Sequence, residues 1–230
     1  MILFTDNFPV VEERSLQLDG WMVTRFGGVM IKNIVFDIGK VLVDFDWESY
    51  FDSLCMPPEI YEEMADATVR SKLWNEFDRG ALPEDEILAA FLAAAPNCKS
   101  QVIALWNNLG ECIKRYDYSM EWIETLKNEG YNVYFLSNYP FRIYEQSKEQ
   151  LAFIEKMDGG IFSYQIKFTK PEPEIFTALF EKYNLKPEEC VFLDDNQRNV
   201  EAAQELGMNV IQFTEYEKAA EELKHMGVGK

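Results

Sequence analysis

The sequence predicts an α/β protein whose core is a Rossmann-like, doubly wound parallel sheet with an inserted all-helical cap. Short apolar runs of strand character alternate with amphipathic helical segments, which is the pattern of strand-to-helix crossover units. Between about residues 47 and 116 this alternation stops, and apolar residues recur at helical spacing instead. A chain of 230 residues with 47% hydrophobic residues is long and apolar enough to bury a sizeable core.

Five strands are expected in order along the chain, at residues 31–37, 131–137, 159–166, 190–195 and 209–214. Helices are expected at residues 119–130, 172–184 and 199–207. Gly130 and Gly207 stand where the first and third of these helices should end. Because helices separate the strands, the sheet should be parallel.

The cap, residues 46–116, contains three segments with helical spacing, at residues 57–69, 82–95 and 100–116. The core then comprises residues 30–45 and 117–230. An insertion directly after the first strand lies above the carboxyl ends of the strands. We therefore expect the cap to form a lid over the residues that end the first strand.

Residues 1–29 form an N-terminal extension whose structure the sequence leaves open. A short hairpin around residues 8–23, a disordered leader and the product of an upstream start codon are all compatible with it. Charged residues interrupt the stretch where a signal peptide needs a continuous apolar run, namely Asp6, Glu12, Glu13 and Arg14. Secretion is therefore not expected, and we predict a cytoplasmic protein.

The chain is strongly acidic, with 22 Lys and Arg against 40 Asp and Glu and a formal net charge of −18. This balance argues against nucleic acid or an anionic membrane surface as a partner. No apolar run reaches the roughly 18 residues that a membrane-spanning helix needs. If the substrate is an anion, lysines close to the site must overcome the field of the whole protein.

Cysteine and histidine offer little chemistry in this chain. The four cysteines, at positions 55, 98, 112 and 190, show no CxxC spacing, and the only histidine is His225 near the carboxyl terminus. No zinc-type cluster follows from these spacings, and reduced thiols suit a cytosolic protein. Carboxylates are therefore the expected catalytic groups, in place of a serine or cysteine with a histidine base.

The most informative stretch is IVFDIGKVLVDFD at residues 34–46, where an apolar strand ends on one carboxylate, Asp37, with Gly39 two residues later. Ligands of open α/β sheets bind beyond the carboxyl ends of the strands. Asp37 is therefore a candidate nucleophile or metal ligand. Taken alone, it could equally be a helix cap.

Three further stretches end strands or open helices on the same side of the predicted sheet. FLSN carries Ser137 and Asn138, FTKPEPEIF carries Lys170 before a helix, and FLDDNQRN carries Asp194 and Asp195. Each alone has an ordinary explanation as a turn, a cap or a solvated lysine. Together with Asp37 they supply a carboxylate nucleophile, neutral phosphate donors, a cation and a metal-binding acid pair.

With these motifs the chain resembles the haloacid dehalogenase superfamily over about residues 30–216. The signature of that superfamily is an aspartate on the first strand, a serine or threonine on the second, a lysine and an acidic pair. The helical insertion is similar to the small cap of the branch that contains sugar phosphatases and phosphoglucomutases. The string FDIGKVLVDFD is similar to the α-D-glucose 1-phosphate phosphatase group.

The resemblance implies a magnesium-dependent phosphatase that hydrolyses a small phosphorylated metabolite, in particular a sugar phosphate. Asp37 would attack phosphorus and form an aspartyl-phosphate that water hydrolyses. Mg²⁺ would be held by the Asp37 carboxylate, the Gly39 carbonyl and Asp195, with Asp194 as a further or alternative ligand. The remaining implied contacts are to the phosphoryl oxygens, from Ser137, the Asn138 backbone amide and Lys170.

Gly39 departs from the superfamily pattern. Phosphatases of the superfamily usually carry a second aspartate there, which protonates the leaving oxygen and then activates water. Loss of such a group typically costs roughly 100- to 10,000-fold in rate. Three explanations stay open: a good leaving group such as an anomeric phosphate, a replacement acid from Asp44 or the cap, or a weak or non-catalytic protein.

For several further residues the sequence allows two interpretations. Lys40 could add charge near the phosphate or be solvated, and Arg79 could contact substrate or link two helices. Residues 44–47 could meet a sugar or pack at the hinge, and Asn199 could orient the acidic loop or start a helix.

Alternative functions also stay open. They are a 2-haloacid dehalogenase, which needs no magnesium, and a non-catalytic phosphate-binding pseudo-phosphatase. A mutase is less favoured because it normally uses the missing acid. The sequence does not determine the oligomeric state.

Overall fold

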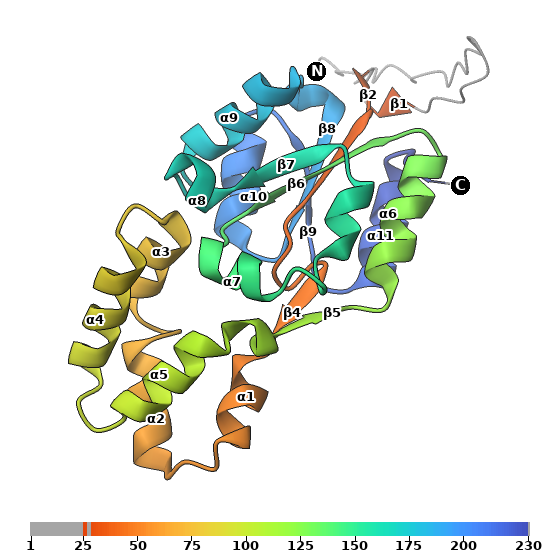
Figure 1. Ribbon diagram of the computed structural model, residues 1–230. Helices are drawn as coiled ribbons and strands as arrows, with labels where there is room; N and C mark the ends of the chain where they lie inside the picture. The colour runs from red at the N-terminus through yellow and green to blue at the C-terminus, as the bar shows by residue number, and fades with distance from the viewer. Residues whose placement is uncertain (1–24, 27–28, 230) are drawn as a thin grey trace, which may run out of the picture.

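The computed structural model describes residues 25–26 and 29–229, and its centre is a parallel sheet of five strands (Figure 1). The order across the sheet is β7-β6-β3-β8-β9, and every neighbouring pair is parallel. The strands are β3 (Asn33–Phe36), β6 (Asn132–Ser137), β7 (Gly159–Phe162), β8 (Cys190–Asp194) and β9 (Asn209–Gln212). The predicted α/β class with a parallel sheet is confirmed.

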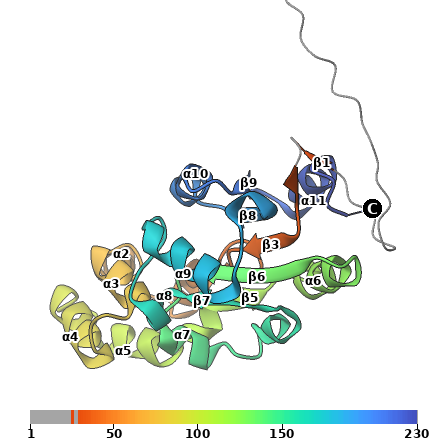
Figure 2. The same cartoon turned by 90° about the horizontal axis from the view of Figure 1, so that it is seen from above.

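Helices cover both faces of the sheet. Neighbouring residues of the central strand β3 point to opposite faces, so their side chains join two different clusters. Ile34 and Phe36 join the core under α6 (Tyr118–Asn128) and α11 (Tyr216–His225). Val35 joins the core under α9 (Pro173–Tyr183) and α10 (Gln197–Glu205). Figure 2 shows these two pairs of helices on opposite sides of the strands. All three β3 side chains are fully buried, as a doubly covered parallel strand requires.

Five consecutive helices form a separate layer below the sheet in Figure 1. They are α1 (Trp47–Ser53), α2 (Pro58–Ala67), α3 (Lys72–Arg79), α4 (Glu84–Ala94) and α5 (Lys99–Asn107). Edge-to-face aromatic contacts build their interior, with ring centroids 6.4 Å apart for Phe77 and Phe91 and 6.2 Å apart for Phe91 and Trp106. These cap residues belong to the same buried hydrophobic cluster as Ile34 and Phe36 of the sheet.

The chain enters and leaves the helical layer through a short antiparallel ladder that the sequence did not predict. β4 (Val43–Phe45) pairs with β5 (Ile113–Arg115), and a 3₁₀ turn at Leu109–Cys112 precedes β5. The expected helix at residues 100–116 is therefore wrong beyond Asn107. Pairing between segments about 70 residues apart decides this conformation, and local spacing does not report such pairing.

The expected strand at residues 159–166 is also shorter than predicted. β7 ends at Phe162, and Ser163–Ile166 form the short helix α8. The Gln165 side chain accepts a hydrogen bond from the Phe162 amide at 3.2 Å, which favours a helical turn at this point.

The remaining elements are short or peripheral. They are β1 (Arg25–Phe26) and β2 (Val29–Met30), which pair antiparallel, helix α7 (Phe141–Gln146), and 3₁₀ turns at Ala152–Lys156 and Pro187–Glu189. The hairpin considered for residues 8–23 lies outside the described residues. Within the described part of the chain, no helix has the length and apolar character needed to cross a membrane.

Candidate active site

Asp37 lies immediately after β3, at the carboxyl edge of the sheet. Its backbone amide donates to the Leu193 carbonyl at 2.8 Å, and its Oδ1 accepts from the Ile38 amide at 2.7 Å. The central strand therefore fixes both the backbone and the carboxylate of this residue. Only 11% of its side chain is exposed.

Lys170 lies between two carboxylates. Its Nζ is 2.8 Å from Oδ1 of Asp37 and 2.6 Å from Oδ2 of Asp194. The Lys170 and Asp194 side chains are 1% and 0% exposed. Although burial lowers the pKa of Lys170, the two carboxylates raise it above its ordinary value, so the ammonium keeps its charge.

Asn138 holds the backbone on which Lys170 is carried. Its side-chain oxygen accepts from the Lys170 amide at 2.7 Å, and its side-chain nitrogen donates to the Lys170 carbonyl at 3.0 Å. Sequence reasoning assigned a role to the backbone amide of Asn138 and missed this role of its side chain. Ser137 ends β6 beside it and is 1% exposed.

The acidic pair follows β8, with its two members in different surroundings. Asp194 accepts a hydrogen bond from the Asn196 backbone amide at 2.8 Å. The side-chain nitrogen of Asn199 lies 3.1 Å from each carboxylate oxygen of Asp194 and donates to them. Asn199 therefore orients the acidic loop, and it also lies in the first turn of α10, so it meets both of its predicted roles. Asp195 is exposed, and its carboxylate comes within 4.8 Å of ligand atoms on Asp37 and Asp194.

The charge of this cluster fits a divalent cation. Three carboxylates face one ammonium, which leaves an excess of two negative charges, and all the candidate ligand atoms are hard oxygens. Burial raises the pKa of Asp37 to about 7; Lys170 opposes this shift, and the charges of Asp194 and Asp195 add to it. A bound divalent ion would relieve both the desolvation and the repulsion.

Gly39 and Lys40 lie beside this cluster and line a cavity of about 210 Å³ between core and cap. A Cβ built on Gly39 would meet nothing within 4 Å, so the position of the missing second acid is open space. Lys40 is exposed and pairs with Asp44 at 2.5 Å. The rest of the wall is mainly apolar, with Phe45 and Trp74 among its residues.

Arg79 does not reach this cavity, because its guanidinium is bound elsewhere. It forms two hydrogen bonds to Glu172, at 2.7 and 2.8 Å, and one to the Lys167 carbonyl at 3.1 Å. Arg79 therefore joins the cap to the core. Its neighbour Asp78 does line the cavity, and sequence reasoning missed it although it quoted the FDRGALPEDE stretch that contains it.

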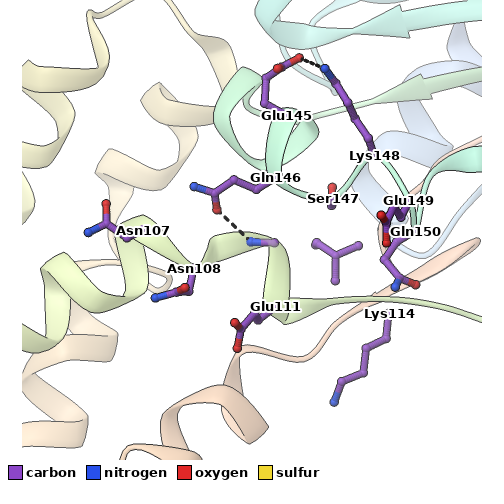
Figure 3. Close-up of a pocket in the computed structure, with 12 residues that line it drawn as sticks. Asn107, Asn108, Glu111, Lys114, Glu145, Gln146, Ser147, Lys148, Glu149 and Gln150 are labelled. Carbon is purple, nitrogen blue, oxygen red and sulfur yellow. Dashed lines mark hydrogen bonds and ion pairs between the residues drawn. The ribbon is translucent and has the colours of Figure 1, made fainter.

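A larger hollow of about 790 Å³ lies elsewhere, between the end of α5 and the segment after α7. Figure 3 shows that its wall carries neutral polar side chains and charged side chains of both signs. Glu145 and Lys148 form an ion pair there, and the Gly110 amide donates a hydrogen bond to the Gln146 side chain. It contains none of the predicted site residues. Cavity size alone therefore does not locate the candidate site.

The fold and the site define a capped, Rossmann-like hydrolase. The model of the haloacid dehalogenase-like hydrolase family matches residues 31–207, and the chain belongs to this family. The superfamily resemblance read from the sequence is confirmed. The narrower similarity to the α-D-glucose 1-phosphate phosphatase group stays a prediction.

Several relatives of this chain carry names of phosphatases. A D-ribitol-5-phosphate phosphatase of Bacteroides thetaiotaomicron is 30% identical over 201 residues, which cover 80% of this chain and 92% of that protein. The sesquiterpene phosphatase astK of Aspergillus oryzae is 24% identical over 195 residues, covering 85% and 96%.

A solved structure shares the fold. A haloacid dehalogenase family enzyme of Bacteroides thetaiotaomicron, in complex with magnesium and inorganic phosphate, superposes with a TM-score of 0.63 at 25% identity. The similarity covers 80% of this chain and 94% of that one.

Proposed function

We propose that this protein is a magnesium-dependent phosphomonoesterase that hydrolyses a small phosphorylated metabolite, in particular a sugar phosphate, through an aspartyl-phosphate on Asp37. The observation that carries the proposal is the buried pairing of Lys170 with both Asp37 and Asp194 beside the exposed acid Asp195. This cluster has the charge for a metal-bound phosphoryl group, and the named activities of the relatives support the same chemistry.

Asp37 would act as the nucleophile. The Ile38 amide and Lys170 hold its carboxylate at the end of the central strand, two residues before Gly39, which lines the cavity. Lys170 and Ser137 would contact the phosphoryl oxygens, together with the Asn138 backbone amide. Ser137 and Asn138 stand at the end of β6, and Lys170 is held by its contacts with Asp37, Asp194 and Asn138, so these groups need little reorganisation during the reaction.

Magnesium would be held by Asp37, Asp195 and the Gly39 carbonyl, with Asp194 as a further or alternative ligand. When bound, it would supply positive charge that offsets the carboxylates and polarises the phosphoryl oxygens. The proposed cellular location is the cytoplasm, and the free state of all four cysteines supports a reducing compartment.

The cavity favours a small alcohol as the leaving group. Its volume of about 210 Å³ lies below the roughly 300–1,000 Å³ of sites for drug-sized ligands. A sugar or sugar alcohol is therefore a better fit than a nucleotide or a sesquiterpene. The name of the ribitol-phosphate relative agrees with this size class.

The experiment is phosphate release from a panel of sugar, sugar-alcohol, nucleotide and prenyl monophosphates, with MgCl₂ and with EDTA. We expect magnesium-dependent release, highest for the small polyol esters, and complete loss with Asp37→Asn. Wild-type turnover by that variant would contradict the mechanism. Chloride release from a 2-chloroacid in EDTA would favour the dehalogenase, and magnesium binding without turnover of any ester would favour a non-catalytic protein.

A further inference from the structure

Asp78 is a cap residue that faces the candidate active site. It stands in the last turn of α3 and lines the 210 Å³ cavity together with Gly39, Lys40 and Asn138. Among the described residues, its carboxylate has no hydrogen-bond or ion-pair partner. Its side chain is half-buried and lines this cavity.

The helix end that carries Asp78 is fixed to the core. The Ser163 hydroxyl donates to the Asp78 carbonyl, and the Lys167 ammonium donates to the Gly80 carbonyl. Gly80 ends α3 with φ +63°, and a Cβ there would lie 3.0 Å from Cβ of Tyr164. With the Arg79 contacts to Glu172, these bonds hold the Asp78 carboxyl over the cavity.

The surroundings of Asp78 favour its protonated form. Burial raises its pKa well above the usual range and the charge of Asp37 raises it further, while Lys170 opposes the shift. The other titratable groups on this side are Tyr139, which senses the Asp78 charge, and Lys40, which lines the same cavity. A carboxyl held neutral beside a reacting ester can donate a proton.

Asp44, the other replacement acid considered from the sequence, is differently placed. It pairs with the Lys40 ammonium at 2.5 Å, hydrogen-bonds with Tyr116, and keeps 31% of its side chain exposed. These contacts engage its carboxylate outside the cavity. It also does not line the cavity, whereas Asp78 does.

We propose that Asp78 is the general acid and base of this enzyme, supplied by the cap in place of the acid missing at Gly39. The proposal rests on the phosphatase function proposed above. In the first step Asp37 forms a bond to phosphorus, the ester P–O bond breaks, and the leaving oxygen takes the Asp78 proton. In the second step Asp78 takes a proton from water, the water oxygen bonds to phosphorus, and the bond from phosphorus to Asp37 breaks.

The test compares Asp78→Asn with the wild type, both loaded with magnesium, on p-nitrophenyl phosphate, phenyl phosphate and D-ribitol 5-phosphate. p-Nitrophenolate leaves without protonation. Phenolate is a more basic leaving group and depends more on protonation, and the alkoxide of ribitol depends on it most. We expect kcat/KM to fall less than about 10-fold for the nitrophenyl ester and roughly 100- to 10,000-fold for the ribitol ester. Since the variant also lacks the base, p-nitrophenol should appear in a burst followed by slow turnover, and the burst amplitude counts folded sites.

Two further variants sharpen this comparison. Gly39→Asp, for which the structure leaves space, should restore phenyl phosphate turnover when added to Asp78→Asn. Asp44→Asn should change kcat/KM by the same factor for all three esters. An equal effect of Asp78→Asn on the three esters would overturn the role of Asp78 and leave the phosphatase intact. No turnover of any ester by the wild type would overturn both proposals.

Discussion

The Nζ of Lys170 lies 2.8 Å from Oδ1 of Asp37, between a strand end and a loop that are 133 residues apart in the chain. The ammonium also contacts Asp194 at 2.6 Å, so a single cation bridges two carboxylates at the ends of the adjacent strands β3 and β8. Stability and chemistry therefore depend on the same pair of contacts, and the predictions below begin from them.

Lys170→Met should destabilise the magnesium-free protein by roughly 3–5 kcal/mol at pH 8, because removing one partner leaves buried carboxylates unpaired. Urea denaturation in EDTA measures this change. Lys32→Met is the matched control, since Lys32 pairs with Glu189 at 2.9 Å but is 45% exposed, and should cost less than about 1 kcal/mol. Equal losses for the two variants would contradict a buried ion pair.

Asp37→Asn should stabilise the magnesium-free protein, and increasingly so as the pH rises. The pKa of the Asp37 carboxyl is about 7 in the folded protein, against an ordinary value of 3.8 that applies to the unfolded chain. Between these two pH values the folded state binds more protons than the unfolded state. The stability of the wild type therefore falls as the pH rises. The gain should grow from about pH 4 to about pH 7 and stay constant above, at most about 4 kcal/mol. Urea midpoints at pH 5.5, 6.5 and 8 in EDTA test this trend.

Asp46→Asn is a control whose effect on stability should have the opposite sign. Hydrogen bonds from the Lys114 side chain and Ser49 lower the pKa of Asp46 to about 2, so its contribution is lost only in acid. This variant should be less stable than the wild type by the same amount at all three pH values. A pH-independent effect of Asp37→Asn as well would show that Asp37 does not titrate in this range.

Asp195→Asn should weaken magnesium binding at least about 10-fold, because it removes an anionic oxygen from the only acid of the cluster that is exposed to solvent. Calorimetric titration with MgCl₂ alone measures the affinity without relying on turnover. Asp44→Asn removes a nearby carboxylate outside the cluster and should keep wild-type affinity within a few-fold. Unchanged affinity in Asp195→Asn would remove Asp195 from the metal site.

Gly39→Ala should stabilise the fold by roughly 0.4–1 kcal/mol, because its Cβ meets nothing within 4 Å and the alanine restricts the unfolded chain. Gly80→Ala should destabilise it, since Gly80 has φ +63° and its Cβ would lie 3.0 Å from Tyr164. Thermal unfolding of the two variants measures these opposite shifts. Destabilisation by Gly39→Ala would show that position 39 is not open.

The sequence by itself determined the elements that depend on local composition. Buried apolar runs marked the five parallel strands, although β7 ends four residues before the predicted end. The polar residues that end these runs, with Lys170, gather at one edge because parallel strands all end there. Asp37, Ser137 and the acidic pair could therefore be selected before any coordinates were known.

Only the tertiary structure decided how distant segments complete one another. Three such features are the pairing of β4 with β5, the hydrogen bonds of the Asn138 side chain to Lys170, and the cavity that Asp78 and Gly39 both line; each joins residues separated by 30 or more positions. Sequence periodicity reports which face of an element is buried, whereas these contacts depend on how the cap and core dock. The physical reason is that hydrogen bonding and the desolvation of a carboxyl are set by neighbours in space, which adjacent residues do not specify.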